Sequence, residues 1–227
     1  SGNNIIFWSW LMGGTAPSKT YTVKVVSDSG NKYRFDDFGT SAVTLDLQEG
    51  GTYTFDVSDS SMNSHPFVIG TAANSSEYST GVTYQLDGVT KTYSQYTSGF
   101  SSATTRKLII TVAASAPALY YWCSVHSGMG GAINTNSTTG SSDFGGTGQS
   151  LVNANTTTGC SIVKYSGTGS AQSIGHGLGV VPNMMWIRRT DGTEDWAVYF
   201  KDHGGAGGSG VNYYQALNTT EKRSSNT

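Results

Sequence analysis

The chain has 227 residues, a length that suits one large or two small domains. Only 12% of the residues are charged and the formal net charge is −2, which argues against the basic surface of a nucleic-acid-binding protein. The sequence has 30 glycines and 13 tyrosines, and its Val, Ile and Thr content favours strands. No segment keeps a 3.6-residue apolar period, so we expect an all-β protein with turn-rich connections and almost no helix.

The first residues form an apolar segment whose role the sequence leaves open. The chain begins at Ser1 without an initiating Met and ends in the polar run 221–227, so we expect a processed chain or a fragment. Residues 5–12 are too short to cross a bilayer, and we expect no membrane span. They are either a first strand packed on the core or part of an exposed docking segment, residues 1–18, that contacts a neighbouring subunit.

From residue 19 onward, short alternating segments predict a succession of strands. In residues 52–57, the side chains of Tyr53, Phe55 and Val57 fall on one face. Turn signals recur about every eight to twelve residues, which is typical of a sandwich or barrel. The strands expected in this part are residues 21–26, 32–35, 42–47, 52–57, 67–69, 107–112 and 118–122. The polar stretch 70–104 is expected to be anchored by four tyrosines: Tyr78, Tyr84, Tyr93 and Tyr96.

The composition of the chain changes at Asn134. Residues 134–158 are nearly all Ser, Thr, Gly and Asn, which is the composition of a flexible linker. A second, smaller β-rich module follows, and it looks truncated. The expected domains are therefore the docking segment 1–18, the main β domain 19–133, the linker 134–158 and the second module 159–227.

Within the second module, the apolar residues 184–188 and 196–200 are expected to form a pair of inner strands. The turn residues 190–192 would join them. Further strands are expected at residues 160–165 and 211–217.

A metal-binding pattern follows the apolar run that ends at Trp122. Cys123, His126 and Met129 supply a thiolate, an imidazole and a thioether, and His65 supplies a second imidazole. Cu(I) favours soft ligands and Cu(II) favours nitrogen, so a His₂Cys set with a weak axial Met serves both oxidation states. The four residues therefore predict a copper site, and the apolar side chains near them would exclude water: Pro66, Phe67 and Trp122.

Other interpretations of these residues stay open. Cys123 and Cys160 can form one disulfide, or one can be a metal ligand and the other a spare thiol. The site can also be vestigial, with the cysteine acting as a small buried side chain. His176 lies among glycines, where a turn is expected, and His203 is expected in a solvated loop. No nucleophile elbow or phosphate loop is present and the carboxylates are scattered, so we expect no enzymatic activity.

Residues 19–133 resemble the cupredoxin family. The Cys-x₂-His-x₂-Met loop followed by glycine is similar to the short ligand loop of amicyanin-type proteins. The upstream His-Pro-Phe corner is similar to the first-histidine region of the same family. The resemblance implies a Greek-key β-sandwich or barrel that binds copper through His65, Cys123, His126 and Met129.

The whole chain has a second resemblance, to virion proteins of marine bacteriophages. Gly175-His-Gly-Leu-Gly and Pro182-Asn-Met-Met-Trp-Ile in the second module are similar to modules of tail-fibre proteins. Residues 55–67 and 119–131 are similar to cupredoxin-like domains of phages that infect marine bacteria. Few charges and many Tyr, Asn, Ser and Gly residues also suit a rigid extracellular scaffold.

This resemblance implies a virion structural protein in a tail fibre, an appendage or a capsid decoration. Its partners would be other virion subunits, in a homo-oligomer, and a host-surface receptor. The alternative is a type 1 copper protein, secreted or at a cell surface, that carries one electron or holds copper. A lesser alternative is a carbohydrate-binding adhesin that uses Trp8, Trp186 or Tyr213, although core positions explain the latter two more simply.

Overall fold

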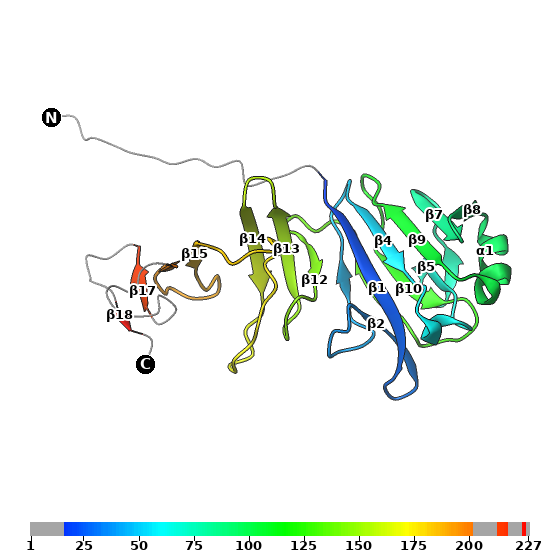
Figure 1. Ribbon diagram of the computed structural model, residues 1–227, viewed down its shortest axis with the longest axis horizontal. Helices are drawn as coiled ribbons and strands as arrows, with labels where there is room; N and C mark the ends of the chain where they lie inside the picture. The colour runs from blue at the N-terminus through cyan, green and yellow to red at the C-terminus, as the bar shows by residue number, and fades with distance from the viewer. Residues whose placement is uncertain (1–15, 202–212, 218–223, 226–227) are drawn as a thin grey trace. The chain divides into compact units, whose positions relative to one another are not determined.

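The structure is a computed structural model that describes residues 16–201, 213–217 and 224–225 (Figure 1). The described residues are mostly β, with several mixed sheets and one short α-helix, which confirms the expected class. The chain divides into two compact units, Ser1–Gly177 and Leu178–Thr227. The described part contains no helix that is long and apolar enough to span a membrane. The apolar run 5–12 and His203 lie outside the described residues.

Two sheets enclose the core of the first unit. The strands of the larger sheet are β1 (Ser18–Ser27), β2 (Asn31–Phe35), β4 (Thr52–Asp56), β7 (Val82–Leu86), β8 (Val89–Lys91) and β9 (Arg106–Thr111). Their spatial order is β2-β1-β4-β9-β7-β8, and only the β1–β4 pair in this sheet is parallel. The strands of the smaller sheet are β3 (Leu45–Asp46), β5 (Phe67–Ala72), β6 (Ser75–Glu77), β10 (Leu119–Cys123) and β11 (Gly131–Asn134). Their order is β3-β11-β10-β5-β6, with β3 and β11 parallel.

Aromatic side chains join these two sheets face to face. In β4, Tyr53 and Phe55 are fully buried while their neighbours are half-exposed, which confirms the inward face predicted for this strand. The ring of Phe55 lies 5.0 Å from that of Phe67 in β5. The ring of Phe35 in β2 lies 5.1 Å from that of Tyr121 in β10, at an interplanar angle of 84°. Such edge-on pairs stabilise a core beyond the area they bury.

One stretch of the first unit contains a helix that the apolar pattern did not predict. The helix α1 (Tyr93–Gly99) begins with a capping box, in which the side chain of Thr92 accepts from the N–H of Gln95 and the side chain of Gln95 accepts from Thr92. Seven residues are too few to show a helical period. The expected tyrosine anchors are confirmed, since Tyr84 and Tyr96 are buried and Tyr78 and Tyr93 pack against the core. Two 3₁₀ turns complete the helical elements of the described residues: η1 (Ser60–Met62) and η2 (Phe100–Ser102).

The strand expected at residues 42–47 is much shorter in the structure. Only Leu45–Asp46 pair as β3. Ala42 has a φ of 51°, in the left-handed region, so the chain turns there instead of extending. The alternating pattern of residues 42–47 therefore predicts a strand correctly only in its second half, because the first half lies in a turn.

The expected linker contains two strands. β12 (Ser141–Asp143), β13 (Ser150–Asn155) and β14 (Cys160–Tyr165) form a three-stranded antiparallel sheet. β14 matches the strand predicted at residues 160–165, whereas the polar composition of β12 and β13 hid these two strands from a pattern-based prediction.

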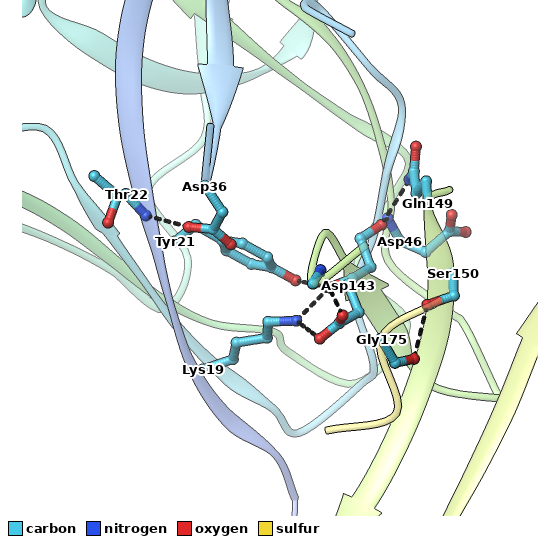
Figure 2. Close-up of polar contacts among 11 residues, drawn as sticks. Lys19, Tyr21, Thr22, Asp36, Asp46, Asp143, Gln149, Ser150 and Gly175 are labelled. Atoms are coloured by element: carbon cyan, nitrogen blue, oxygen red, sulfur yellow. Dashed lines mark hydrogen bonds and ion pairs between the residues drawn. The ribbon is translucent and has the colours of Figure 1, made fainter. Parts of the chain in front are cut away.

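This three-stranded sheet is docked on the main β domain (Figure 2). The Nζ of Lys19 in β1 donates to the carbonyl of Ser142 at 2.7 Å and forms an ion pair with Asp143 at 2.8 Å. The hydroxyl of Tyr21 donates to the same carbonyl at 2.7 Å. The ring of Phe144 is buried against the core. The connection after residue 134 is therefore held in place by both polar and apolar contacts.

The second unit contains a four-stranded sheet. Its strands are β15 (Met184–Ile187), β16 (Ala197–Phe200), β17 (Tyr213–Ala216) and β18 (Ser224–Ser225), in that spatial order. β15 and β16 are antiparallel neighbours, as predicted. The prediction that both are inner strands is wrong, because β15 lies at the sheet edge and its four side chains are 38–46% exposed. Trp186 is among them, so a core position does not explain this tryptophan.

Candidate metal centre

The strand pairing of the smaller sheet brings the predicted ligands to one end of the main domain. β5 and β10 are antiparallel neighbours (Figure 1), and Cys123, the last residue of β10, pairs with Phe67, the first residue of β5. His65 lies two residues before Phe67, and its N–H donates to the carbonyl of Met62 in a turn. His126 lies in the β10–β11 loop, residues 124–130, which we call the ligand loop.

Three of the four predicted ligands converge. The Sγ of Cys123 lies 3.9 Å from the Nδ1 of His65 and 3.7 Å from the Nδ1 of His126. The centroids of the two imidazole rings are 4.6 Å apart. Each of the three residues offers one ligand atom, and these three atoms all lie within 4.8 Å of one another. In the described part of the chain, no other cluster of three His, Cys, Asp or Glu side chains is suited to a metal ion.

These separations fit a bound metal. Protein-bound zinc, a first-row metal, lies about 2.3 Å from a thiolate and about 2.0 Å from an imidazole nitrogen. At the roughly 120° angle of a trigonal set, these bond lengths place sulfur and nitrogen about 3.7 Å apart. The observed distances of 3.7 and 3.9 Å agree with this value. One metal ion can therefore be bound by all three residues with little movement.

The three ligands differ in their exposure to solvent. Cys123 is buried, His65 is half-buried and His126 is exposed. Burial lowers the pKa of His65, and the nearby His126 lowers it further. The lowered pKa favours the neutral imidazole, which is the form that binds metal. The three residues of the predicted apolar wall are all buried: Pro66, Phe67 and Trp122. Trp122 directly precedes Cys123 in β10, so its side chain lies on the opposite face of the strand, near Gly70. Their role in excluding water from the ligands stays a prediction.

Met129, the fourth predicted ligand, lies at the end of the ligand loop. Its side chain is buried in the core cluster, and its carbonyl accepts from the N–H of Tyr33 at 2.9 Å. Its assignment as the axial ligand stays a prediction.

Both cysteines are free, which removes the alternative of a disulfide between Cys123 and Cys160 in this structure. His176 is in the described part of the chain but does not join the ligand group.

Sequence reasoning missed a tyrosine beside the ligands. The hydroxyl of Tyr33 donates to the carbonyl of His65 at 3.0 Å. Burial raises the pKa of Tyr33, and the adjacent Cys123 raises it further, so the hydroxyl stays protonated. Tyr33 lies 32 residues before His65, and no sequence motif links the two. Only the packing of β2 against β5 and β10 brings Tyr33 to the site.

Comparison with known protein families gives a match in the C-terminal part of the chain, after the candidate metal centre. Residues 133–227 match a family described as Domain of unknown function (DUF7483). This match covers less than half of the chain and begins one residue before the composition change at Asn134. It includes β12–β14 and the second unit but none of the candidate ligands. No curated protein and no solved structure was found to match the chain.

Proposed function

We propose that the protein binds one copper ion through His65, Cys123 and His126, with Met129 as a weak axial ligand. The observation that carries this proposal is the approach of one thiol and two imidazoles to within 4.8 Å. A soft sulfur combined with two imidazoles favours copper over hard cations such as magnesium or calcium. The proposal includes a finer fold assignment, a cupredoxin-like Greek-key sandwich for residues 19–133. The two facing sheets and the position of the ligand loop support it.

In this proposal, the chain's own residues bind the ion and exclude water from it. Cys123 would present its sulfur from the buried side, while His126 would close the site from the surface. Pro66 and Phe67, which follow His65, would keep water away from the sulfur. Bound copper would supply one-electron redox chemistry.

Absorption spectroscopy after addition of Cu(II) tests the copper site. We expect an intense thiolate-to-copper band near roughly 600 nm, with one copper per chain. Cys123→Ser should abolish the band, whereas Cys160→Ser, which changes the other free cysteine, should keep it. Absence of the band in the unaltered protein, or its survival in Cys123→Ser, would refute the proposal.

The exposed strand β15 favours a second proposal, which concerns the kind of assembly to which the copper-binding protein belongs. Four consecutive apolar residues at a sheet edge, each 38–46% exposed, offer both apolar surface and unpaired backbone groups to another chain. We propose that the protein is a non-enzymatic structural subunit of a phage virion, assembled as a homo-oligomer and in contact with a host receptor. The copper-binding domain would then stabilise the assembly or contact the host. The alternative is a type 1 copper protein that acts alone.

Light scattering coupled to size-exclusion chromatography separates these two settings. The virion proposal predicts a defined oligomer that Trp186→Glu converts to smaller species. Val89→Glu is the control, because Val89 is 55% exposed on the first unit, outside β15. A monomeric protein that still binds copper would contradict the virion setting and favour the isolated copper protein.

A further inference from the structure

The ligand loop is fixed on both sides of His126. On the Cys123 side, the N–H of Ser124 donates to the carbonyl of Pro66 at 3.1 Å. On the other side, the chain passes through Gly128, whose φ of 74° lies in the left-handed region that favours glycine. Both polar backbone groups of Gly128 contact side chains that come from other parts of the domain.

The first contact comes from the turn between β5 and β6. The N–H of Gly128 donates to the Oδ1 of Asn74 at 3.1 Å. Asn74 itself has a φ of 61°, which asparagine tolerates better than most residues. The second contact comes from β2, where the Nζ of Lys32 donates to the carbonyl of Gly128.

Strand β2 makes two further contacts through the next residue. The N–H of Tyr33 donates to the carbonyl of Met129 at 2.9 Å, and its hydroxyl donates to the carbonyl of His65 at 3.0 Å. Lys32 and Tyr33 therefore hold two consecutive carbonyls of the ligand loop. Through the same strand, the backbone of His65 is tied to the loop that carries His126.

We propose that Lys32, Tyr33 and Asn74 are positioning residues that fix the ligand loop before metal binds and thereby set the relative affinity for Cu(I) and Cu(II). The inference rests on the proposed copper site. The two oxidation states prefer different ligands and geometries, so a loop that relaxes freely would adapt to each. A loop held at Gly128 and Met129 imposes one arrangement on both. Groups that hydrogen-bond directly to metal ligands typically contribute 10- to 100-fold to metal affinity, and we take the lower end for contacts to Gly128, two residues from His126.

Two substitutions remove the side-chain contacts to Gly128. Asn74→Gly removes the acceptor and suits the positive φ, and Lys32→Met removes the donor. Each should weaken binding of at least one oxidation state by about 10-fold or more. Because the two states should respond unequally, the reduction potential should move, by about 59 mV for each tenfold change in the affinity ratio. Asn74→Asp and Lys32→Arg keep an acceptor and a donor and should restore most of the affinity.

Matched controls separate positioning from general stability. Asp87, in the β7–β8 turn, also has a positive φ (47°), and its Oδ1 accepts from the N–H groups of Thr104 and Thr105. Asp87→Gly therefore removes a similar turn contact away from the ligand loop. Lys24→Met removes a half-buried lysine of β1 that pairs with Asp37. Both controls should leave the copper affinities, the reduction potential and the thiolate band unchanged.

Amide hydrogen exchange of the metal-free protein gives a readout that needs no copper. Asn74→Gly should speed exchange at the Gly128 amide, and Asp87→Gly should not. If the unaltered protein shows the thiolate band but Asn74→Gly and Lys32→Met change neither the affinities nor the potential, the positioning role is refuted. If the unaltered protein shows no band, the copper site itself fails and this inference fails with it, even where exchange at Gly128 responds.

Discussion

Replacing Phe144 by alanine should destabilise the whole first unit, although this residue lies in a segment with linker composition. The Phe144 side chain is 5% exposed, and its ring lies 5.2 Å from Phe38, 5.8 Å from Tyr21 and 5.9 Å from Phe35. Phe→Ala in a core costs about 3–5 kcal/mol, and we expect about 3 because the ring lies at the core's edge. At about 2–4 °C for each kcal/mol in a unit of this size, the melting temperature should fall by about 6–12 °C.

The assay is thermal and guanidinium unfolding of the full chain, together with amide hydrogen exchange. Exchange is needed because two compact units can unfold in separate transitions. Ile162→Ala is the control, because Ile162 is 42% exposed on β14 of the same sheet and should change stability by less than about 1 kcal/mol. If Phe144→Ala loosens only β12–β14 and leaves β4 and β10 fully protected, the sheet is not coupled to the core and the reasoning is wrong.

Two further predictions concern the same unit. Burial acts to raise the pKa of Asp143, but the hydrogen bond and charge of Lys19 outweigh it, so the folded pKa lies below its usual value. The stability that Asp143 contributes is therefore present above about pH 4 and lost as the pH falls through the folded pKa. Asp143→Asn should cost about 1–2 kcal/mol at neutral pH, and urea unfolding should show the difference vanish on acidification. Gly130→Ala should cost about 3 kcal/mol or more, since the new Cβ would clash with the backbone carbonyl of Tyr121. Gly39→Ala meets nothing within 4 Å, so equal destabilisation by both changes would contradict this reading.

Most of the ligand group was predictable because Cys123, His126 and Met129 lie close together in the sequence. His65 lies 58 residues before Cys123, and it was found because the copper pattern needed a second imidazole and a histidine stood just before an expected strand. The contacts of Lys32 and Asn74 with Gly128 span 96 and 54 residues. Such contacts depend on how β2 and the β5–β6 turn pack, and no local pattern specifies that packing.

The errors in the fold have similar physical causes. The apolar residues Met184–Ile187 predict a strand, but hydrophobicity does not say whether a neighbouring strand or chain covers it. Residues 141–155 lack an alternating apolar pattern, so nothing marked β12 and β13 as strands. One aromatic residue, Phe144, connects this segment to the core, and a single ring is too weak a signal in a polar segment.

The contacts that hold β12 on the main β domain also have a consequence for how a pulling force would reach the ligands. Beyond Cys123 the chain runs through the ligand loop and β11 before it reaches β12–β14 and the second unit. A pull on the C-terminal residues would therefore have to overcome the contacts that hold β12 on the main β domain before tension reached β11. These contacts include the Lys19–Asp143 pair, the hydrogen bond from Tyr21 and the packing of the Phe144 ring. While these contacts hold, a force on the C-terminal half would leave the spacing of His65, Cys123 and His126 unchanged.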